Sequence, residues 1–272
     1  MTGPMRRIAL FADVHGNSVA LDAVMRDIDD TGVAERYCLG DLVGYGPDPV
    51  GVIERLRVRG YPVVRGNYDQ GVGNRSGTCG CYYATDRARS DGAASYEFTA
   101  RAVGDDDAAW LAGLPPELRF DEAGVRVVLT HGSPRRINEY LMPDRVERQL
   151  ARLARDAEAD VVCSGHVHIP YHRSFPAALD DPSGPVVHYV NAGSVGKPKD
   201  GDPRACWVEL LIGRADEVRE AAPDDRHAAR AGTSDAWVGM VVHRVDYDVE
   251  PVVSAMAAAG LPSTLADALR SG

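Results

Sequence analysis

RRIALFADVHG, residues 6–16, is the segment from which the architecture of this chain can be worked out. Its apolar, β-rich first part ends in Asp13 and His15, and a glycine, Gly16, comes next. Residues i and i+2 of an extended chain point to the same face, so both polar side chains can reach one ion. A glycine lets the backbone turn sharply there. The segment therefore predicts a strand that carries metal-binding side chains at its carboxyl end.

Alternating helix-like and strand-like segments follow this first strand. Asn17 or Ser18 can cap a helix whose apolar residues share one face, and Gly32 ends that helix. Two more strand-like runs, 35–41 and 61–67, are separated by a second helix-like segment. This β-α-β-α-β order predicts an α/β fold with short crossovers.

The second half of the chain returns to strands after a long interruption. Residues 71–116 begin as a loop and continue as helices, and a further helix is expected at about 143–158. The polar range 213–236 is typical of an exposed hairpin tip or a mobile insert. We predict one domain over 1–272, with 71–116 and 213–236 as inserts and two short helices at the end. The strands expected in this half are 125–132, 159–168, 184–194, 205–212 and 238–248.

Metal-binding residue types recur where the predicted strands end. Beyond the first strand, five positions follow an apolar run and adjoin or lie close to a glycine: Asp41, Asn67, His131, His166 and His168. Open α/β sheets bind ligands at the carboxyl ends of their strands. Any one of these residues alone could be a turn or core residue. Their conjunction at separate strand ends predicts a metal site.

The ordered motifs D-x-H, G-D, G-N-x-D, H-G and G-H-x-H resemble the calcineurin-like metallophosphoesterase superfamily over roughly residues 6–200. NAGSVGKPKDGDPRACWVEL, residues 191–210, looks like its compact bacterial branch, which includes the YfcE-like phosphodiesterases. The resemblance implies a four-layer α-β-β-α fold, in which two packed mixed β-sheets are flanked by helices. It also implies hydrolysis of a phosphomonoester or phosphodiester by a hydroxide that bridges two metal ions.

The resemblance also distributes the seven ligands between the two ions. It implies one ion held by Asp13, His15 and His168, a second held by Asn67, His131 and His166, and Asp41 as the bridge between them. Oxygen and imidazole nitrogen without thiolate suit two divalent transition-metal ions, namely Mn, Fe, Zn, Ni or Co. In this interpretation the catalytic residues are Asp41, Asn67, Tyr68 and His131.

Tyr68 departs from the familiar pattern, because many members of the superfamily have a histidine there that protonates the leaving group. A tyrosine, with an ordinary pKa of about 10, is protonated at neutral pH and can donate a hydrogen bond. It is a poorer proton shuttle than histidine, because its pKa lies far from the working pH. The alternative is that Tyr68 only packs beside the site.

The candidate substrate-binding residues are Arg65, Tyr68, Arg135 and Ser194. Arginine binds phosphate oxygens bidentately, and Arg135 and its neighbour Arg136 closely follow a predicted metal ligand. Surface charges would give the same sequence pattern, so this alternative stays open. Ser194 belongs to a glycine-rich loop, 193–196, whose backbone N–H groups can approach a phosphate.

Cys79 and Cys81 flank a glycine in the loop after Asn67. The pair could bind a metal or form a strained disulfide, but no further cysteine pair is near in sequence to complete a thiolate site. We favour a loop at the rim of the active site, where Tyr82 and Tyr83 help to choose the substrate. The odd total of five cysteines does not suggest a secreted disulfide framework.

Charge and hydropathy restrict the partners of the chain. The formal net charge of −10 disfavours general nucleic-acid binding, whereas bound cations would still attract a small phosphorylated substrate. No apolar run approaches the roughly 18–20 residues that cross a bilayer, and no signal-cleavage site follows the first strand. We therefore expect a cytoplasmic enzyme that does not bind membranes, and the oligomeric state stays open.

Two other functions fit the same pattern. A non-catalytic metal-binding scaffold subunit would retain the fold, but here all seven ligand positions are filled, which favours an enzyme. A protein phosphatase would need an open groove. The insert at 71–116 favours a lid over the site, and hence a small substrate.

Overall fold

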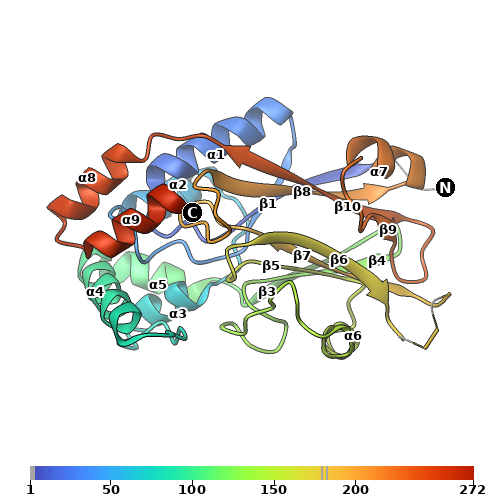
Figure 1. Cartoon of the computed structure of the whole chain (residues 1–272), viewed down its shortest axis with the longest axis horizontal. Helices are drawn as coiled ribbons and strands as arrows, with labels where there is room; N and C mark the ends of the chain where they lie inside the picture. The colour runs from blue at the N-terminus through green and yellow to red at the C-terminus, as the bar shows by residue number, and fades with distance from the viewer. Residues whose placement is uncertain (1–3, 179, 182) are drawn as a thin grey trace.

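The computed structural model describes residues 4–178, 180–181 and 183–272, and its strands form two five-stranded sheets. The two sheets pack against each other between outer helices (Figure 1). In order across the first sheet the strands are β2 (Glu35–Cys38), β1 (Arg6–Phe11), β8 (Ala205–Gly213), β10 (Trp237–Val245) and β9 (Ala229–Arg230). In the second sheet they are β3 (Glu117–Glu122), β4 (Val125–Thr130), β5 (Val161–Ser164), β7 (Val186–Ala192) and β6 (Pro170–Pro176).

Both sheets are mixed. β1 and β2 run parallel, as do β4, β5 and β7, and the other neighbouring strands pair in antiparallel fashion. The parallel strands bring their carboxyl ends to one edge of each sheet. The predicted α/β fold, with two mixed sheets flanked by helices, is confirmed.

The helices cover the outer faces and one end of the molecule. α1 lies over the first sheet and α6 over the second, while α3, α4, α5, α8 and α9 gather at the left of Figure 1. The bounds of the helices are α1 (Ser18–Thr31), α2 (Pro49–Arg59), α3 (Asn67–Gly73), α4 (Asp86–Ala102), α5 (Asp105–Gly113), α6 (Glu147–Asp156), α7 (Ala215–Ala221), α8 (Glu250–Ala258) and α9 (Ser263–Ser271).

The first helix begins and ends where its sequence predicts. The Asn17 side chain accepts a hydrogen bond from the backbone N–H of Ala20, and Gly32 adopts a left-handed conformation with φ of 72°. A left-handed residue at a helix end favours glycine, which has no Cβ to clash. The buried face of α1 packs on one side of β1 and positions the loop that carries Asp13.

β1 is buried on both of its faces, which explains its continuous apolar run. Ile8 and Leu10 point between the sheets, where they pack in one cluster with residues of β4, β5, β7 and β8. Ala9 and Phe11 point to the other side and pack in the cluster that contains α1. The residues just beyond β1 are thereby held deep in the molecule.

The third predicted strand, 61–67, is wrong. Only Val63 makes an isolated bridge, to Cys38, before the chain turns into α3. Pro62 has no N–H with which to extend a ladder. β3 and β6 were not anticipated, because each is an edge strand of the second sheet whose polar, partly exposed residues obscure an alternating pattern.

The two predicted inserts contain regular structure. Range 71–116 includes α4 and α5, and α5 packs closely on α3. Range 213–236 joins the neighbouring antiparallel strands β8 and β10, and Val218 of α7 packs against Leu211. This range is therefore a hairpin connection that includes a helix docked on the sheet.

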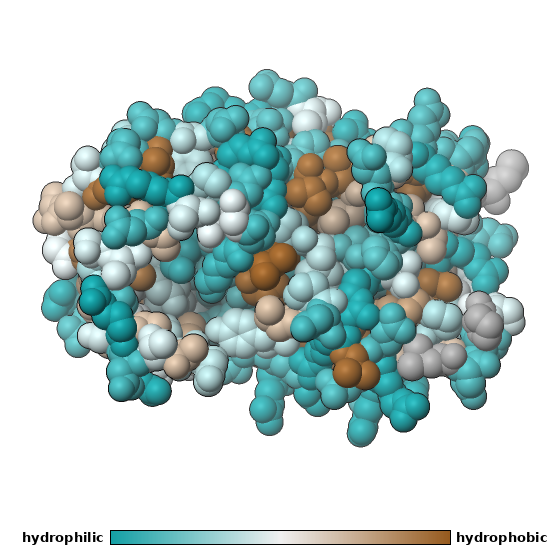
Figure 2. Space-filling model, viewed as in Figure 1, coloured by the Kyte–Doolittle hydropathy of each residue, from teal (hydrophilic) through white to brown (hydrophobic). Residues whose placement is uncertain are grey.

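The face in Figure 2 is mainly hydrophilic, and its hydrophobic residues form small separate patches. Within the described ranges, no helix combines the length and the apolar character that crossing a membrane requires.

Candidate metal centre

The structure brings all seven predicted ligands together at the strand ends. They follow β1, β2, β4 and β5 or stand at the start of α3, and none is more than 3% exposed: Asp13, His15, Asp41, Asn67, His131, His166 and His168. Buried polar groups of this kind are costly unless they have partners. Their convergence therefore requires a physical explanation.

The backbone is strained at most of these positions. Positive φ values, which residues other than glycine rarely adopt, occur at Asp13, His15, Asp41, His166 and His168, with angles from 49° to 67°. Left-handed residues of this kind cost of order 1–3 kcal/mol each and cluster at functional sites. Here they turn the chain at each strand end, so that the side chains meet in one space.

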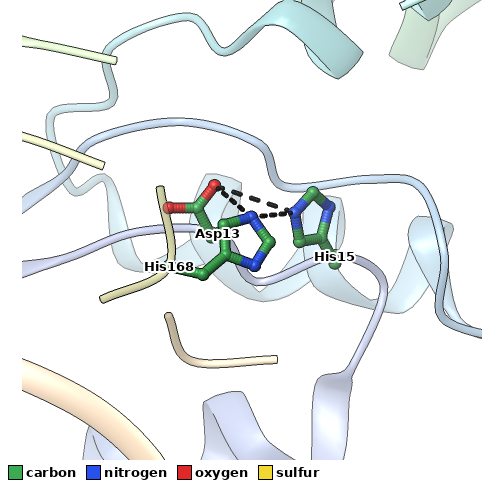
Figure 3. A group of neighbouring side chains, drawn as sticks. All are labelled: Asp13, His15 and His168. Atoms are coloured by element: carbon green, nitrogen blue, oxygen red, sulfur yellow. Dashed lines mark hydrogen bonds and ion pairs between the residues drawn. The ribbon is translucent and has the colours of Figure 1, made fainter. Parts of the chain in front are cut away.

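Asp13, His15 and His168 form the first group of predicted ligands, and their side chains point toward one another (Figure 3). His15 Nε2 and His168 Nε2 are 3.1 Å apart. Asp13 Oδ1 lies 3.2 Å from His168 Nε2 and 3.7 Å from His15 Nε2. Three potential ligand atoms from two distant parts of the chain thus face one point.

Backbone carbonyls determine which nitrogen of each histidine carries hydrogen. His15 Nδ1 lies 3.1 Å from the Val43 carbonyl oxygen, and His168 Nδ1 bonds to the Lys197 carbonyl oxygen. A carbonyl only accepts, so each Nδ1 donates and leaves a bare Nε2. Burial and His168 lower the pKa of His15 to about 3, and burial holds that of His168 well below its usual value. Burial raises the pKa of Asp13, the third member of the group. Two nitrogen lone pairs and a carboxyl oxygen therefore converge in a buried space, an arrangement that fits a cation.

The second group consists of Asp41, His131 and His166, with Asn67 beside them. His131 Nδ1 lies 2.8 Å from the Leu39 carbonyl oxygen, which directs Nε2 into the site. His131 Nε2 lies 3.0 Å from Asn67 Oδ1 and 3.4 Å from Asp41 Oδ2. The amide nitrogen of Asn67 donates to the Cys79 carbonyl at 3.0 Å, so its oxygen must face His131. Outer hydrogen bonds of this type commonly orient metal ligands.

The charges of the second group are strongly coupled. Burial acts to lower the pKa of His131, but Asp41 outweighs it and raises this pKa to about 9. Burial acts to raise the pKa of Asp41, but His131 outweighs it and holds that pKa far below normal. Within the described residues, the buried atoms Asp13 Oδ1 and His166 Nε2 have no hydrogen-bond partner. Both atoms are ordinary ligands of divalent metals, so the residues present fit such ions.

Asp69 is a site residue that the ligand prediction missed. Its carboxylate is fully buried and accepts hydrogen bonds from the backbone N–H groups of Asp41 and Leu42, both at 2.9 Å, and of Gly66 at 2.8 Å. It ties the loop after β2 to the start of α3. The last letter of the motif G-N-x-D was the available signal, but it does not say which backbone the carboxylate binds.

Tyr68 is fully buried beside the centre. Its backbone N–H donates to Asp41 Oδ1 at 2.8 Å, and its hydroxyl oxygen lies 3.4 Å from Ser95 Oγ. Burial raises the pKa of Tyr68 well above its usual value, so the phenol stays protonated. Proton donation by Tyr68 and simple packing both stay predictions.

The other candidate substrate-binding residues have hydrogen bonds within the protein. Arg65 donates to the Ala112 carbonyl at 2.7 Å, and exposed Arg135 donates from Nε to Glu139 at 2.7 Å. Ser194 is fully buried and donates to the Asp13 carbonyl at 2.8 Å, which anchors the glycine-rich loop to the metal centre. Their contact with substrate stays a prediction.

The loop with Cys79 and Cys81 lies against the second ligand group. Asn67 Nδ2 is 3.1 Å from Cys81 Sγ, and the two sulfur atoms are 2.6 Å apart as free thiols. Asn138 donates to the Gly80 carbonyl at 3.0 Å and links this loop to the segment after β4. This position agrees with a loop at the rim of the site, while substrate choice by Tyr82 and Tyr83 stays a prediction.

Comparison with known proteins identifies the family. Residues 5–211 match the calcineurin-like phosphoesterase superfamily domain. An uncharacterized protein from Methanocaldococcus jannaschii is 31% identical over 208 residues, which cover 74% of this chain and 80% of the relative. The chain belongs to the calcineurin-like phosphoesterase superfamily, as its motifs predicted.

Solved structures agree with this assignment. A metallophosphoesterase from Sphaerobacter thermophilus is 26% identical with a TM-score of 0.68, and the match covers 97% of this chain and 98% of that one. A hypothetical protein from Pyrococcus horikoshii shares the fold at 20% identity, with a TM-score of 0.73 and 97% of each chain covered. The compact bacterial branch stays a prediction.

Proposed function

We propose that this chain hydrolyses a phosphomonoester or phosphodiester with the help of two divalent transition-metal ions. The convergence of bare Nε2 atoms with the Asp13 carboxylate, in a fully buried site, carries the proposal. These nitrogen and carboxylate atoms are all electron-pair donors and cannot neutralise one another, whereas a divalent cation can coordinate all of them at once.

Asp41 is suited to bridge the two ligand groups. Its Oδ2 lies 3.8 Å from His15 Nε2 in the first group and 3.4 Å from His131 Nε2 in the second. Tyr68 holds the other oxygen through its backbone N–H, so the carboxylate cannot rotate freely. Two divalent ions held by these residues would lower the pKa of a bound water and neutralise phosphoryl oxygens.

Hydrogen bonds within the chain orient the side chains that would carry this chemistry. Asn67 and the three carbonyl-anchored histidines orient their donor atoms before any substrate arrives, which reduces the reorganisation that catalysis needs. Tyr68 keeps its proton and can donate to a leaving group. We further propose that the ions are Mn, Fe, Zn, Ni or Co, that the substrate is a small phosphorylated molecule, and that the enzyme acts in the cytoplasm.

Metal analysis and an ester screen test this proposal together. Purified chain should contain up to two transition-metal ions, and with added Mn²⁺ it should hydrolyse some member of a panel of phosphomonoesters, phosphodiesters and phosphopeptides. Asp41→Asn should remove most of this turnover, because a neutral amide cannot offset the charge between two cations. Asp235→Asn, at an exposed position, should leave it unchanged.

The outcomes separate the competing functions. A chain that binds two ions but cleaves no ester in the panel would be a metal-binding scaffold, which overturns the enzyme proposal. Turnover of phosphopeptides alone would favour a protein phosphatase. A chain that binds no transition metal under any loading condition would remove the basis of the proposal.

A further inference from the structure

Lysine occurs at only two positions in this sequence, Lys197 and Lys199. The other 28 of its 30 basic residues counted as Lys+Arg are arginines. Both lysines lie in the loop between β7 and β8, which runs along the first group of metal ligands. In a chain that otherwise uses arginine for positive charge, two lysines at one functional site indicate a requirement for the lysine ammonium itself.

The backbone groups of both lysines form hydrogen bonds with the predicted ligand His168. The Lys197 carbonyl accepts the hydrogen bond from His168 Nδ1, and the Lys199 N–H donates to the His168 carbonyl at 3.2 Å. The backbone that leads into Lys197 has little freedom, because a Cβ at Gly196 would lie 1.8 Å from the carbonyl oxygen of Val14. The backbone of both lysines is therefore anchored beside His168.

The ammonium group of Lys197 lies beside an aromatic ring that contacts the first group of metal ligands. Lys197 Nζ is 4.8 Å from the centroid of the Tyr45 ring, and that ring meets the His15 ring edge-on at 4.9 Å. The ring holds the ammonium through a cation–π contact but leaves its N–H donors unused. The side chain of Lys199, two residues further along the loop, is exposed to solvent.

Neither lysine has an ion-pair partner within the described ranges, although carboxylates are close in sequence. Asp202 pairs with Arg204 at 2.7 Å, and Asp200 pairs with Arg244. These two acidic residues of the loop thus form ion pairs with arginines. Two neighbouring, unpaired cations repel each other, which is unfavourable unless an anionic ligand binds them.

The charge of the centre indicates which anion fits. Two divalent ions, two carboxylates and one hydroxide would leave a net charge of about +1, and two protonated lysines would raise it to about +3. A phosphodiester carries one negative charge, whereas a terminal phosphate carries about 1.5 to 2 at neutral pH. Lysine binds phosphate as a compact point charge with rotatable donors, which suits a group that changes shape during reaction.

We propose that Lys197 and Lys199 bind a doubly charged terminal phosphoryl group and so select a substrate that ends in one. The phosphate can belong to a monoester or to the end of a phosphoanhydride chain. This inference rests on the proposed function and specifies the substrate class of the same site. The lysines are specificity-determining residues here, and the metal ligands stay as assigned.

The test compares two esters with the same leaving group. Lys197→Gln and Lys199→Gln should each lower kcat/KM for para-nitrophenyl phosphate about 10–100-fold, the loss expected for one charge-assisted hydrogen bond. For bis(para-nitrophenyl) phosphate the change should stay within about threefold, since its single charge gains less. Arg204→Gln removes a cation of the same loop that already has a partner, and should change neither value. Inorganic tripolyphosphate is assayed alongside. Its hydrolysis would indicate a phosphoanhydride substrate, and hydrolysis of the ester alone would indicate a phosphomonoester.

Equal losses of kcat/KM on both esters, or no loss on either, would overturn the proposal. It would also be overturned if the wild type prefers the diester and both variants keep that preference. Metal content is measured for each variant, so that lost metal is recognised. If the metal-loaded wild type cleaves no ester, the proposed function fails, but the lysines are still testable through calorimetric binding of inorganic phosphate. Weaker binding by about tenfold or more in both variants would support the lysine site, and unchanged affinity would overturn it.

Discussion

The carboxylate of Asp69 accepts a hydrogen bond from the backbone N–H of Asp41 at 2.9 Å. Asp41, the proposed bridging ligand, is therefore held through its backbone by a carboxylate that contacts none of the other predicted ligand side chains. The same carboxylate binds the N–H groups of Leu42 and Gly66, so it joins two ligand-bearing segments in one unit. Tyr68 completes the unit by donating to Asp41 Oδ1.

Asp69→Asn should weaken the metal centre without removing a ligand. An amide has one acceptor oxygen, and its NH₂ group would face backbone N–H groups from which it cannot accept a hydrogen bond. The loop after β2 should therefore lose part of its anchoring. Loss of such an orienting partner typically costs 10–100-fold in metal affinity or activity. Competitive titration of Mn²⁺ with a chelating dye measures the metal affinity, and kcat/KM at saturating Mn²⁺ measures any further effect on activity.

The control for this variant is Asp235→Asn, which makes the same chemical change at an exposed position. It should leave both values unaltered. If Asp69→Asn keeps wild-type metal affinity and wild-type kcat/KM, the loop does not depend on the carboxylate, and the positioning role is wrong.

Metal loading should raise the thermal stability of the chain. Buried acceptor atoms face one another in the centre, so a cation that binds only the folded state stabilises it by mass action. The gain is about 2.7 kcal/mol when the free metal concentration is one hundred times Kd. For a chain of this size that corresponds to several degrees in Tm. Calorimetry before and after exhaustive chelation measures the shift.

The double variant His15→Ala with His131→Ala removes one ligand from each group and provides the comparison. Its Tm should respond to Mn²⁺ much less than that of the wild type. An equal shift in both proteins would place the stabilising ions elsewhere.

Local sequence signals predicted much of this fold because they act over few residues. The Asn17 cap and the left-handed Gly32 define α1, and both depend on neighbours within one helical turn. The residues after β1 reached the site because strand ends of an α/β sheet converge. Val63 shows the limit of this reasoning: its run is apolar, but proline and the early start of α3 reduce it to one bridge.

The rest depended on contacts between distant segments. Nothing local shows that Asp69 reaches back to the loop after β2, or that the loop with Lys197 lies along His168. Arginine was favoured as the phosphate-binding residue for its bidentate geometry, yet Arg135 pairs with Glu139 in the structure. The unusual scarcity of lysine was a signal in the composition, but only the fold gave it a place.

The cluster around Glu139 should make stability depend on pH. A hydrogen bond from Arg135, with others from Ser133 and Arg145, lowers the pKa of Glu139 to about 2. A folded-state pKa below the unfolded value contributes stability above the unfolded value of about 4.5, and this contribution disappears as pH falls toward 2. Glu139→Gln should therefore lower Tm at pH 6, and its difference from the wild type should shrink between pH 4.5 and pH 3.

Thermal unfolding at pH 6, 4.5 and 3 measures this difference, and a gap that stays constant with pH would contradict it. Arg135→Gln serves as the partner variant and also tests whether Arg135 binds substrate. A lower Tm with unchanged KM would limit Arg135 to its contact with Glu139, whereas a raised KM would support substrate binding.

Tyr68→Phe tests whether the phenol assists the leaving group. An alkyl phosphate needs a proton as its P–O bond breaks, whereas para-nitrophenolate leaves largely unaided. If Tyr68 donates that proton, the variant should lose roughly 10²-fold or more on alkyl esters, the lower end of general-acid effects, and very little on para-nitrophenyl esters. Turnover of the two ester types by wild type and variant, at equal metal occupancy, measures the contrast.

Tyr96→Phe is the matched control for this last experiment. It also removes a hydroxyl of a buried tyrosine, one that donates to the Gly71 carbonyl at 2.8 Å, so it should cost stability without distinguishing the esters. Small and equal effects of Tyr68→Phe on both ester types would mean that Tyr68 only packs, through its ring and its 3.4 Å contact with Ser95. Tyr68→His supplies the converse, because a side chain with a pKa nearer neutrality should raise alkyl-ester turnover if this position faces the leaving group.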